Sequence, residues 1–470
     1  LLAFFFFFQS LEAMAVHLTR GASDIFASVI FDKKAKDQLV GVYIVPFLYF
    51  RQPLDLENVR HRLFEKLMPI ARFRSRVVSV AGCLNLGHRS AFMELDDTTM
   101  KASFTELVTA PEGLRTDADL NHFVSNLYAQ SWDPALPLWR AFVLNGLEDG
   151  RSLLMLKIDH AMADGVGLLD VLYHIIDSKE DNSPKKPYVN QLKSTASAAP
   201  RSYWDGCLLH AKGWWRAIYR PFLGELMPGD PPNCFKFKNA KVAGKTKAVC
   251  STNGIRLDEI KAIKSRISGA TVNDVLMTLM SLTLRKYFMK YEASTLKQAV
   301  SATIPISVRK DAEVDIFNPK FFGNDFSMAQ IHFPLKEEDP IKAFQKVKSQ
   351  IDVIKVSPEP RVRSALVKSL TSCAAPQSVL ASVLMDQFGR VTATLSNVIG
   401  PMQEVECLGQ ALDDLSFYAM VPLGLYLGVV QYNGWIKVGI CCDGELEPSP
   451  QRLADCWDEA FQTLKEASMQ

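Results

Sequence analysis

Strand-like and helix-like hydrophobic patterns occur in both halves of the chain without the regular alternation of a repeated strand–helix unit. This mixture constrains the fold most. Residues 39–50 form a continuous apolar run rich in β-branched side chains, typical of a buried strand. Residues 54–69 instead repeat apolar side chains at helical spacing. At 470 residues the chain is too long for one ordinary core and suits two domains of roughly 200 residues. The patterns predict an α/β protein with mixed sheets in two halves.

The same reasoning predicts most other elements. Further strands are expected at 299–308, 324–335 and 390–401, a short strand pair at 83–95, and hairpins at 138–160 and 424–443. Further helices are expected at 120–132, 167–177, 271–292, 339–355 and 450–467. The second hairpin turns at Asn433-Gly434, a strong two-residue turn signal. The helix at 339–355 has Asp339 as its N-cap and Pro340 at its first position.

We divide the chain into an extension (1–17), an N-terminal domain (18–177), a linker (178–245) and a C-terminal domain (246–470). Residues 178–202 are polar and rich in Pro, Ser and Lys, which is typical of a surface linker. The extension opens with a short apolar run that lacks the features of a signal peptide and is too short to span a membrane. We expect the natural start at Met14, with residues 1–13 not native. A short apolar anchor is the alternative.

Residues 202–228 combine aromatic and basic side chains. Trp204, Trp214 and Trp215 alternate with Lys212 and Arg216 along a stretch with helical character. That composition suits a helix at a membrane surface. It suits equally an interdomain helix whose aromatic side chains pack into protein, and the sequence leaves both interpretations open.

Charge and cysteine content exclude several classes of protein. The net charge is +2, so nothing indicates a nucleic-acid partner. The nine cysteines are odd in number and show no zinc-binding spacing, which favours free thiols in a reducing compartment and no metal site.

The stretch KIDHAMADGVG carries the strongest candidate for chemistry. The second strand of the first predicted hairpin delivers the chain to His160, and Asp164-Gly165 follows in a short loop before a helix. An imidazole is well suited to take a proton near neutral pH. Asp164 can fold back to fix the loop or the ring, and Gly165 permits a positive φ or a close backbone approach. The pattern alone is also compatible with a packed histidine and an ordinary turn.

Several separated motifs together resemble those of the wax ester synthase/diacylglycerol acyltransferase family. They are DPALPLWR (133–140), DHAMADGVG (159–167), ATVNDVLMTLM (270–280), FFGNDFS (321–327) and LSNVIGP (395–401), in that order. The resemblance extends from about Leu18 to the last helix. Other acyltransferases that use coenzyme A and peptide-synthetase condensation domains share a bare His-x-x-x-Asp, so the combination is the more specific signal.

The resemblance implies two chloramphenicol-acetyltransferase-like domains, with mixed sheets flanked by helices and an active-site tunnel between them. It implies that His160 is the general base and that Asp164 holds the loop. The chain departs from the family motif at Asp159, where the family has a first histidine. That change could alter the tunnel or the substrate choice, and an ionised carboxylate close to His160 would favour imidazolium.

The remaining motif residues have different expected roles. Asn273 could point toward the tunnel, whereas Thr271-x-x-Asp274 predicts a capping box, so Asp274 is expected to be structural. Ser396 and Asn397 are polar within an apolar strand, so burial would require partners. A donor near them could stabilise an oxyanion, but the sequence singles out none. The expected structural motif residues are Pro137, Leu138, Trp139, Asp274, Gly400 and Pro401.

The implied activity is transfer of a long acyl group from acyl-CoA to a fatty alcohol or diacylglycerol, giving wax esters, triacylglycerol or both. Acyl-CoA would be a substrate, with no bound cofactor. Peripheral contact with the endoplasmic reticulum or lipid droplets is expected, on the cytoplasmic side. The alternatives are an acyltransferase for a smaller alcohol, and a catalytically weakened lipid-binding or scaffold protein.

Overall fold

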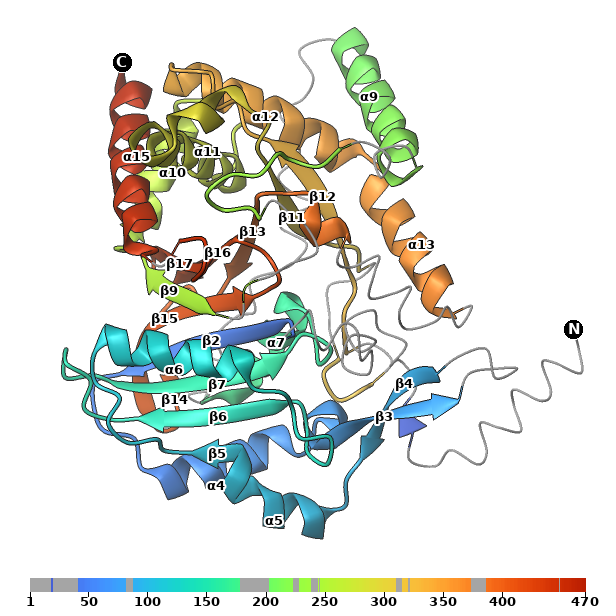
Figure 1. The fold of residues 1–470 in the computed structure, drawn as a ribbon, viewed down its shortest axis with the longest axis vertical. Helices are drawn as coiled ribbons and strands as arrows, with labels where there is room; N and C mark the ends of the chain where they lie inside the picture. Colours follow the sequence, from blue (N-terminus) through green and yellow to red (C-terminus); the bar gives the residue numbers. More distant parts are fainter. Residues whose placement is uncertain are drawn as a thin grey trace, which may run out of the picture.

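The computed structural model describes residues 18–19, 41–81, 88–177, 203–222, 228–237, 244, 246–309, 315–319, 322–372, 386–447 and 449–470. Two large sheets form the two halves of the molecule, and helices cover them on the outside (Figure 1). The predictions for the extension and for a polar linker at 178–202 lie outside the described residues. The proposed domain boundaries stay predictions.

The lower sheet in Figure 1 is built mainly from the N-terminal half. Its strand order is β5 (Val108–Thr109), β6 (Trp139–Leu144), β7 (Ser152–Asp159), β2 (Tyr43–Phe50), β15 (Gln410–Met420), β14 (Glu406–Cys407) and β8 (Ile176–Asp177). The predicted hairpin of β6 and β7 is confirmed, since the two strands pair antiparallel. Every residue of β7 is buried, which explains its unbroken apolar run.

The upper sheet contains only C-terminal strands. Its order is β10 (Ile255–Arg256), β17 (Trp435–Asp443), β16 (Leu425–Tyr432), β13 (Ala393–Ile399), β11 (Ser301–Ser307) and β12 (Phe326–His332), and β9 (Lys247–Ser251) also pairs with β17. The hairpin of β16 and β17 is confirmed. Asn433 and Gly434 have φ values of 47° and 76°, as the predicted turn requires.

Helices pack against both sheets. In the N-terminal half they are α4 (Leu56–Leu67), the 3₁₀ turn η1 (Ala71–Arg74), α5 (Asp97–Leu107), α6 (Asp117–Ala129) and α7 (Gly165–Ile175). Later in the chain they are α9 (Tyr203–Phe222), α10 (Leu257–Ser265), α11 (Val272–Tyr291), the 3₁₀ turn η4 (Ala293–Lys297), α12 (Pro340–Val356), α13 (Glu359–Ser372) and α15 (Gln451–Met469). The Asp339 cap of α12 is confirmed, because its side chain accepts from two backbone N–H groups of the first turn.

One small sheet corrects a prediction. Strand β4 (His88–Glu94) lies within the predicted pair at 83–95, but its partners are β3 (Ser75–Ala81) and β1 (Leu18–Thr19). The pairing strand comes earlier because residues 75–81 follow η1 and run antiparallel to β4 over its whole length.

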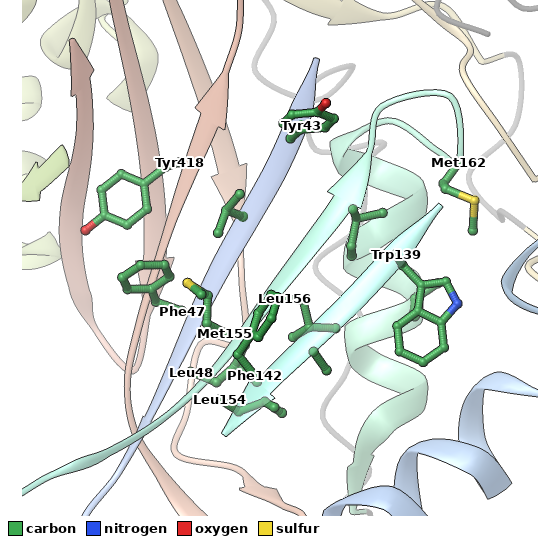
Figure 2. Close-up of a cluster of buried hydrophobic side chains, with 14 of the residues drawn as sticks. Tyr43, Phe47, Leu48, Trp139, Phe142, Leu154, Met155, Leu156, Met162 and Tyr418 are labelled. Carbon is green, nitrogen blue, oxygen red and sulfur yellow. The ribbon is translucent and has the colours of Figure 1, made fainter. Parts of the chain in front are cut away.

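The core of the lower sheet is formed by large apolar side chains of β2, β6 and β7, with Tyr418 of β15 packed beside them (Figure 2). The rings of Phe47 and Tyr418 meet edge to face at 4.9 Å. Trp139 is fully buried, and its indole N–H donates to the carbonyl of Phe73 at 2.8 Å. The expectation that Trp139 is a core residue is confirmed.

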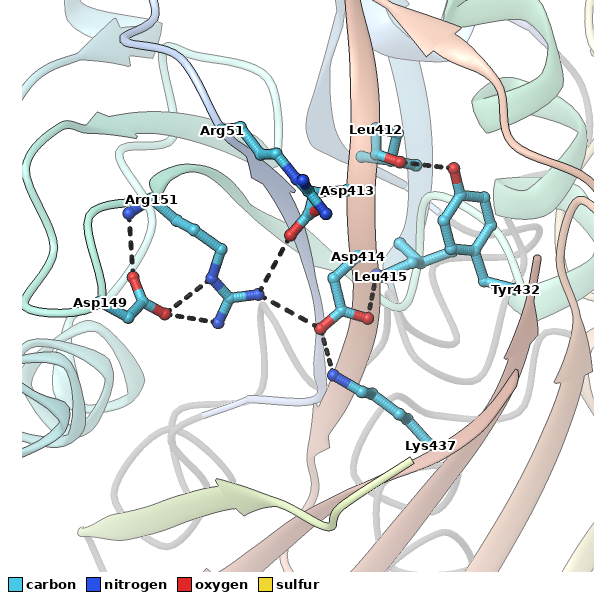
Figure 3. A network of polar contacts seen from close by, with 9 residues as sticks. All are labelled: Arg51, Asp149, Arg151, Leu412, Asp413, Asp414, Leu415, Tyr432 and Lys437. Atoms are coloured by element: carbon cyan, nitrogen blue, oxygen red, sulfur yellow. Dashed lines mark hydrogen bonds and ion pairs between the residues drawn. The ribbon is translucent and has the colours of Figure 1, made fainter. Parts of the chain in front are cut away.

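Strand β15 links the two halves, and no strand was predicted there. It belongs to the C-terminal part of the chain but pairs antiparallel with β2 along its length. Its register shifts between Leu412 and Asp414, where Arg151 contacts both Asp413 and Asp414 and Lys437 of the upper sheet also pairs with Asp414 (Figure 3). The lower sheet therefore contains a strand from the C-terminal part of the chain, and a polar network joins it to the upper sheet.

Candidate active site

His160 lies immediately after β7 and is held by main-chain contacts on two sides. Its N–H donates to the carbonyl of Val42 at 2.8 Å, and its own carbonyl accepts from the side-chain amide of Asn324 at 2.6 Å. The imidazole lies beside the ring of Phe326, with 5.5 Å between centroids. Val42 belongs to the N-terminal half, whereas Asn324 and Phe326 come from the start of β12. His160 therefore lies where the two halves meet.

The surroundings of His160 favour the neutral imidazole. Burial is the largest influence and lowers its pKa below the ordinary 6.5, although the Asp164 carboxylate raises it. Hydrogen bonds of the ring with its own carbonyl and with the Asn324 side chain also raise the pKa, but burial outweighs them. A neutral imidazole at neutral pH is the form that can accept a proton.

Asp164 joins the motif loop to the C-terminal half. One carboxylate oxygen caps α7 by accepting from the N–H of Gly167 at 2.9 Å. The other accepts from the Arg309 guanidinium at 2.6 Å and from the N–H of Asp325 at 2.9 Å. Both members of the ion pair are buried, at 9% and 5% side-chain exposure for Arg309 and Asp164. Asp164 thus contacts the loop, α7 and the segment around β12, and it does not point its carboxylate to solvent.

A second arginine, Arg72, holds the motif loop in place. Arg72 donates through Nη1 to the carbonyls of Ala161 and Met162, at 3.0 and 3.1 Å. Gly323 makes room for it, because a Cβ there would lie 2.7 Å from Nη2 and the residue has a φ of 150°. Its guanidinium also lies 4.7 Å from the centre of the Phe92 ring. The middle of the motif loop is therefore fixed by the side chain of a distant residue.

Asp159 is held by groups of the N-terminal half. Its carboxylate accepts from the indole N–H of Trp132 at 2.8 Å and from the N–H of Ala161 at 2.9 Å. Burial first and then the Asp159 carboxylate raise the pKa of Tyr43. Burial lowers the pKa of Lys157 to about 7, although Asp159 raises it. Residues two positions apart in a strand point to the same face, which explains why Asp159 and Lys157 share surroundings.

The expectation for Gly165 is wrong. Its φ is not among the positive values, and a Cβ there would meet only Val398, at an ordinary 3.5 Å. Gly165 is simply the first residue of α7. The glycine with a steric role is Gly167, where a Cβ would lie 3.1 Å from the Ala163 side chain and 3.2 Å from the Phe322 ring. Close packing of α7 on the start of β12 requires a small residue two positions later than predicted.

The polar residues of the two other motifs lie side by side. The side chain of Asn397 on β13 donates to the side-chain oxygen of Asn273 at 2.6 Å. Asp274 completes the predicted capping box with Thr271 at the start of α11, so that prediction is confirmed. Ser396 points to the opposite face of β13, where it hydrogen-bonds with the hydroxyl of Tyr426.

The remaining motif residues lie at strand ends. Leu138 accepts from the N–H of Asp159 at 3.0 Å, and Pro137 is buried just before it. Pro401 accepts from the N–H of Asn433 at 3.0 Å. Gly400 allows a close backbone approach, since a Cβ there would lie 2.6 Å from the carbonyl oxygen of Gln431. These contacts are structural, as expected.

Sequence reasoning named neither Arg72, Arg309 nor Gly167, and it quoted Asn324 only within a motif. Asn324 could have been found, because it lies in the quoted FFGNDFS stretch. Arg309 and Arg72 gave no local signal, because their partners are 145 and 89 or more positions away in the chain.

Comparisons with known proteins agree with this geometry. The family model "Wax ester synthase/diacylglycerol acyltransferase catalytic domain" matches residues 7–218, and "WS/DGAT C-terminal domain" matches residues 322–465. Wax ester synthase/diacylglycerol acyltransferase 3 of Arabidopsis thaliana is 25% identical over 382 residues, 75% of this chain and 77% of that protein. Wax ester synthase/diacylglycerol acyltransferase 5 of the same plant is 23% identical, and the match covers 90% of each chain.

Solved structures show the same fold. The wax ester synthase/diacylglycerol acyltransferase of Marinobacter aquaeolei VT8 has a TM-score of 0.62 at 16% identity, covering 97% of this chain and all of that one. Trichothecene 15-O-acetyltransferase of Fusarium sporotrichioides has a TM-score of 0.59 at 13% identity, covering 95% and 98%. The predicted class, two chloramphenicol-acetyltransferase-like halves with mixed sheets, is confirmed. The tunnel between them stays a prediction.

Proposed function

The chain belongs to the wax ester synthase/diacylglycerol acyltransferase family and is therefore an acyltransferase, and from this premise we propose that it transfers a long acyl group from acyl-CoA to a lipid hydroxyl. The acceptor would be a fatty alcohol, diacylglycerol or both. The observation that carries the proposal is the setting of His160. A partly buried, neutral imidazole is held by main-chain contacts from both halves of the molecule.

The proposed reaction needs one base and no covalent enzyme intermediate. In this proposal Nδ1 carries the proton of the neutral ring. Nε2 is then free to take the proton of the acceptor hydroxyl. The acceptor oxygen attacks the thioester carbonyl carbon, and the carbon–sulfur bond breaks as the tetrahedral intermediate collapses. The proton passes from Nε2 to the departing sulfur, giving free CoA and an ester.

The contacts of Asp164 support a positioning role for that residue. Its two oxygens already accept from Gly167, Arg309 and Asp325. A carboxylate engaged in this way orients the loop and does not exchange protons with substrate. The hydrogen bonds of Asp159 with Trp132 and Ala161 support a structural role for its carboxylate.

The test is CoA release from palmitoyl-CoA, with hexadecanol and separately with diacylglycerol as acceptor. We expect release only when an acceptor is present, and a loss of most of that rate in His160→Ala. The ranking of the two acceptors, with short alcohols as a third arm, names the substrate class. Equal rates for the parent and His160→Ala would exclude His160 as the base. Acyl-CoA binding without turnover by either protein would favour the lipid-binding alternative.

We also propose that α9 rests on a phospholipid surface. Trp204, Trp214 and Trp215 are 77%, 62% and 65% exposed, and Leu208 and Ile218 are more than half exposed as well. The exposure of Trp214 and Trp215 favours the membrane-surface interpretation of the segment over packing into protein. Within the described part of the chain, no helix has the length and apolar character needed to cross a membrane.

The other face of α9 is anchored to the C-terminal half. Ala217 is buried, and Arg216 pairs with the buried Glu359. A Cβ on Gly213 would lie 3.3 Å or less from atoms of Val356 and Ser357. A helix fixed on one face, with an exposed tryptophan stripe on the other and Lys212 at its flank, has the composition of an interfacial helix. Insoluble acceptors would be reached from such a surface.

Vesicle co-sedimentation tests this second proposal. The parent should bind vesicles of phosphatidylcholine with phosphatidylserine, and Trp204→Gln/Trp215→Gln should bind several-fold more weakly. Met289→Gln is the matched control, because Met289 is 54% exposed on α11, away from α9. Equal binding by all three proteins would contradict a role for the α9 stripe.

A further inference from the structure

Ser307, the last residue of β11, carries a buried hydroxyl without a hydrogen-bond partner among the described residues. Two other hydroxyls of the same strand are satisfied. Ser301 donates to Asp230 at 2.8 Å, and Thr303 shares a hydrogen bond of 2.6 Å with Thr394. Buried hydroxyl groups in folded proteins nearly always have a partner. The hydroxyl of Ser307 is therefore a feature that packing alone does not explain.

The face of β11 that carries Ser307 meets the candidate active site. Residues directly opposite each other in an antiparallel pair share a face of the sheet. Ser307 lies opposite Phe326 of β12, and the Phe326 ring contacts the His160 ring at 5.5 Å between centroids. Ser307 is therefore one strand away from a side chain in contact with the imidazole.

The neighbouring strand gives the same position from the other side. Strand β13 runs parallel to β11 with Thr303 level with Thr394, and the same register continued for four residues brings Ser307 level with Val398. Val398 lies 3.5 Å from the position of a Cβ on Gly165. Two residues beyond Ser307, Arg309 pairs with Asp164. Ser307 thus lies beside strand residues that contact both ends of the motif loop, Phe326 at His160 and Val398 at Gly165.

The polar residues predicted on β13 are less suited to donate to a substrate. Asn397 donates through its side-chain nitrogen to Asn273, and it points to the face of β13 opposite that of Val398. Ser396 already hydrogen-bonds with Tyr426. Among the described residues of β11 and β13, Ser307 has a buried hydroxyl without a hydrogen-bond partner.

We infer that the Ser307 hydroxyl donates a hydrogen bond to the thioester carbonyl oxygen and stabilises the negative charge that develops on it, which rests on the proposed function. A donor that is already desolvated and fixed on a strand needs no reorganisation when the charge appears. Its hydrogen bond to an oxyanion is stronger than one to a neutral carbonyl. The interaction therefore stabilises the transition state more than the bound substrate, and it should act on kcat.

Kinetics of Ser307→Ala give the first test. We expect kcat to fall on the order of 100-fold, with little change in the KM of palmitoyl-CoA. Ser307→Thr keeps a hydroxyl and should recover most of the rate. Ser416→Ala is the matched control, because it removes the same atoms from the buried part of β15, opposite Phe47 and away from the motif loop. It should retain the parent kcat.

Binding of two unreactive analogues separates this inference from the proposed function. One is a CoA thioether of a long-chain methyl ketone, which keeps a carbonyl, and the other has a methylene group in its place. The parent should bind the ketone more tightly, and Ser307→Ala should lose that preference. If the parent shows no turnover, a ketone preference that the parent has and Ser307→Ala lacks would still support the donor, although the proposed acyl transfer fails. A parent kcat in Ser307→Ala, or a ketone preference that is absent from the parent or unchanged in Ser307→Ala, would overturn the inference.

Discussion

The pKa of His160 predicts where activity is lost in acid. Burial, the largest influence, places the folded-state pKa below 6.5, so the folded protein keeps a neutral base to lower pH than a free imidazole would. The acid limb of kcat/KM should therefore have its midpoint below pH 6.5. Asn324→Ala removes a hydrogen bond that raises this pKa, and its midpoint should shift to still lower pH.

The same residue contributes to the pH dependence of stability. The unfolded chain takes up a proton on this histidine at a higher pH than the folded chain does. Its contribution to stability is therefore full above about pH 6.5 and is lost as the pH falls from there toward the folded-state pKa.

A pH–rate profile from pH 4.5 to 8 measures the midpoint of the acid limb of kcat/KM. A midpoint at or above 6.5 would show that burial does not dominate.

Loss of the Arg309 side chain should lower both the unfolding free energy and kcat. Arg309→Ala leaves the Asp164 carboxylate buried without its cation, which costs about 3 kcal/mol of unfolding free energy. The loop that carries His160 should loosen, so kcat should fall as well. Urea unfolding measures the first effect. Arg256→Ala is the control, because the Arg256–Asp258 pair is more than half exposed on both sides and should contribute little. Similar losses for the two variants would contradict the role given to the buried pair.

At the scale of elements, the start of α11 combines a structural cap with a motif residue. Thr271 and Asp274 cap the helix mutually, and Asn273 between them contacts Asn397. Thr271→Ala should lower the unfolding free energy by about 1 kcal/mol, whereas Thr271→Ser should keep most of it. Thermal unfolding of the two variants gives the comparison. A loss equal in both would mean that the hydroxyl is not what caps α11.

At the scale of the whole molecule, β15 makes the two halves interdependent. A protein ending at residue 177 lacks β15, and β2 would then present an open, apolar edge. We expect this fragment to aggregate or to lack cooperative unfolding, and we expect mixing with a fragment starting at residue 203 to restore it. Circular dichroism and size-exclusion chromatography measure both outcomes, with the full chain as control. Independent, cooperative folding of residues 18–177 would show that the proposed boundary marks a self-sufficient domain.

The sequence by itself determined the local elements and the family. The periodicity of side chains, the caps of α11 and α12 and the turn at Asn433-Gly434 depend on residues a few positions apart, so one chain suffices to predict them. The motif around His160 was found in the same way, because its parts are consecutive in the chain.

Only the tertiary structure decided which side chains complete the site. Arg309 and Arg72 contact the motif loop from 145 and 89 positions away, and nothing in their own neighbourhood signals a partner there. The pairing of β15 with β2, and the direction in which Asp159 points, were likewise outside the reach of the sequence. These features depend on how the two sheets dock, and a hydrophobic pattern determines which face of a strand is buried but not what is packed against it.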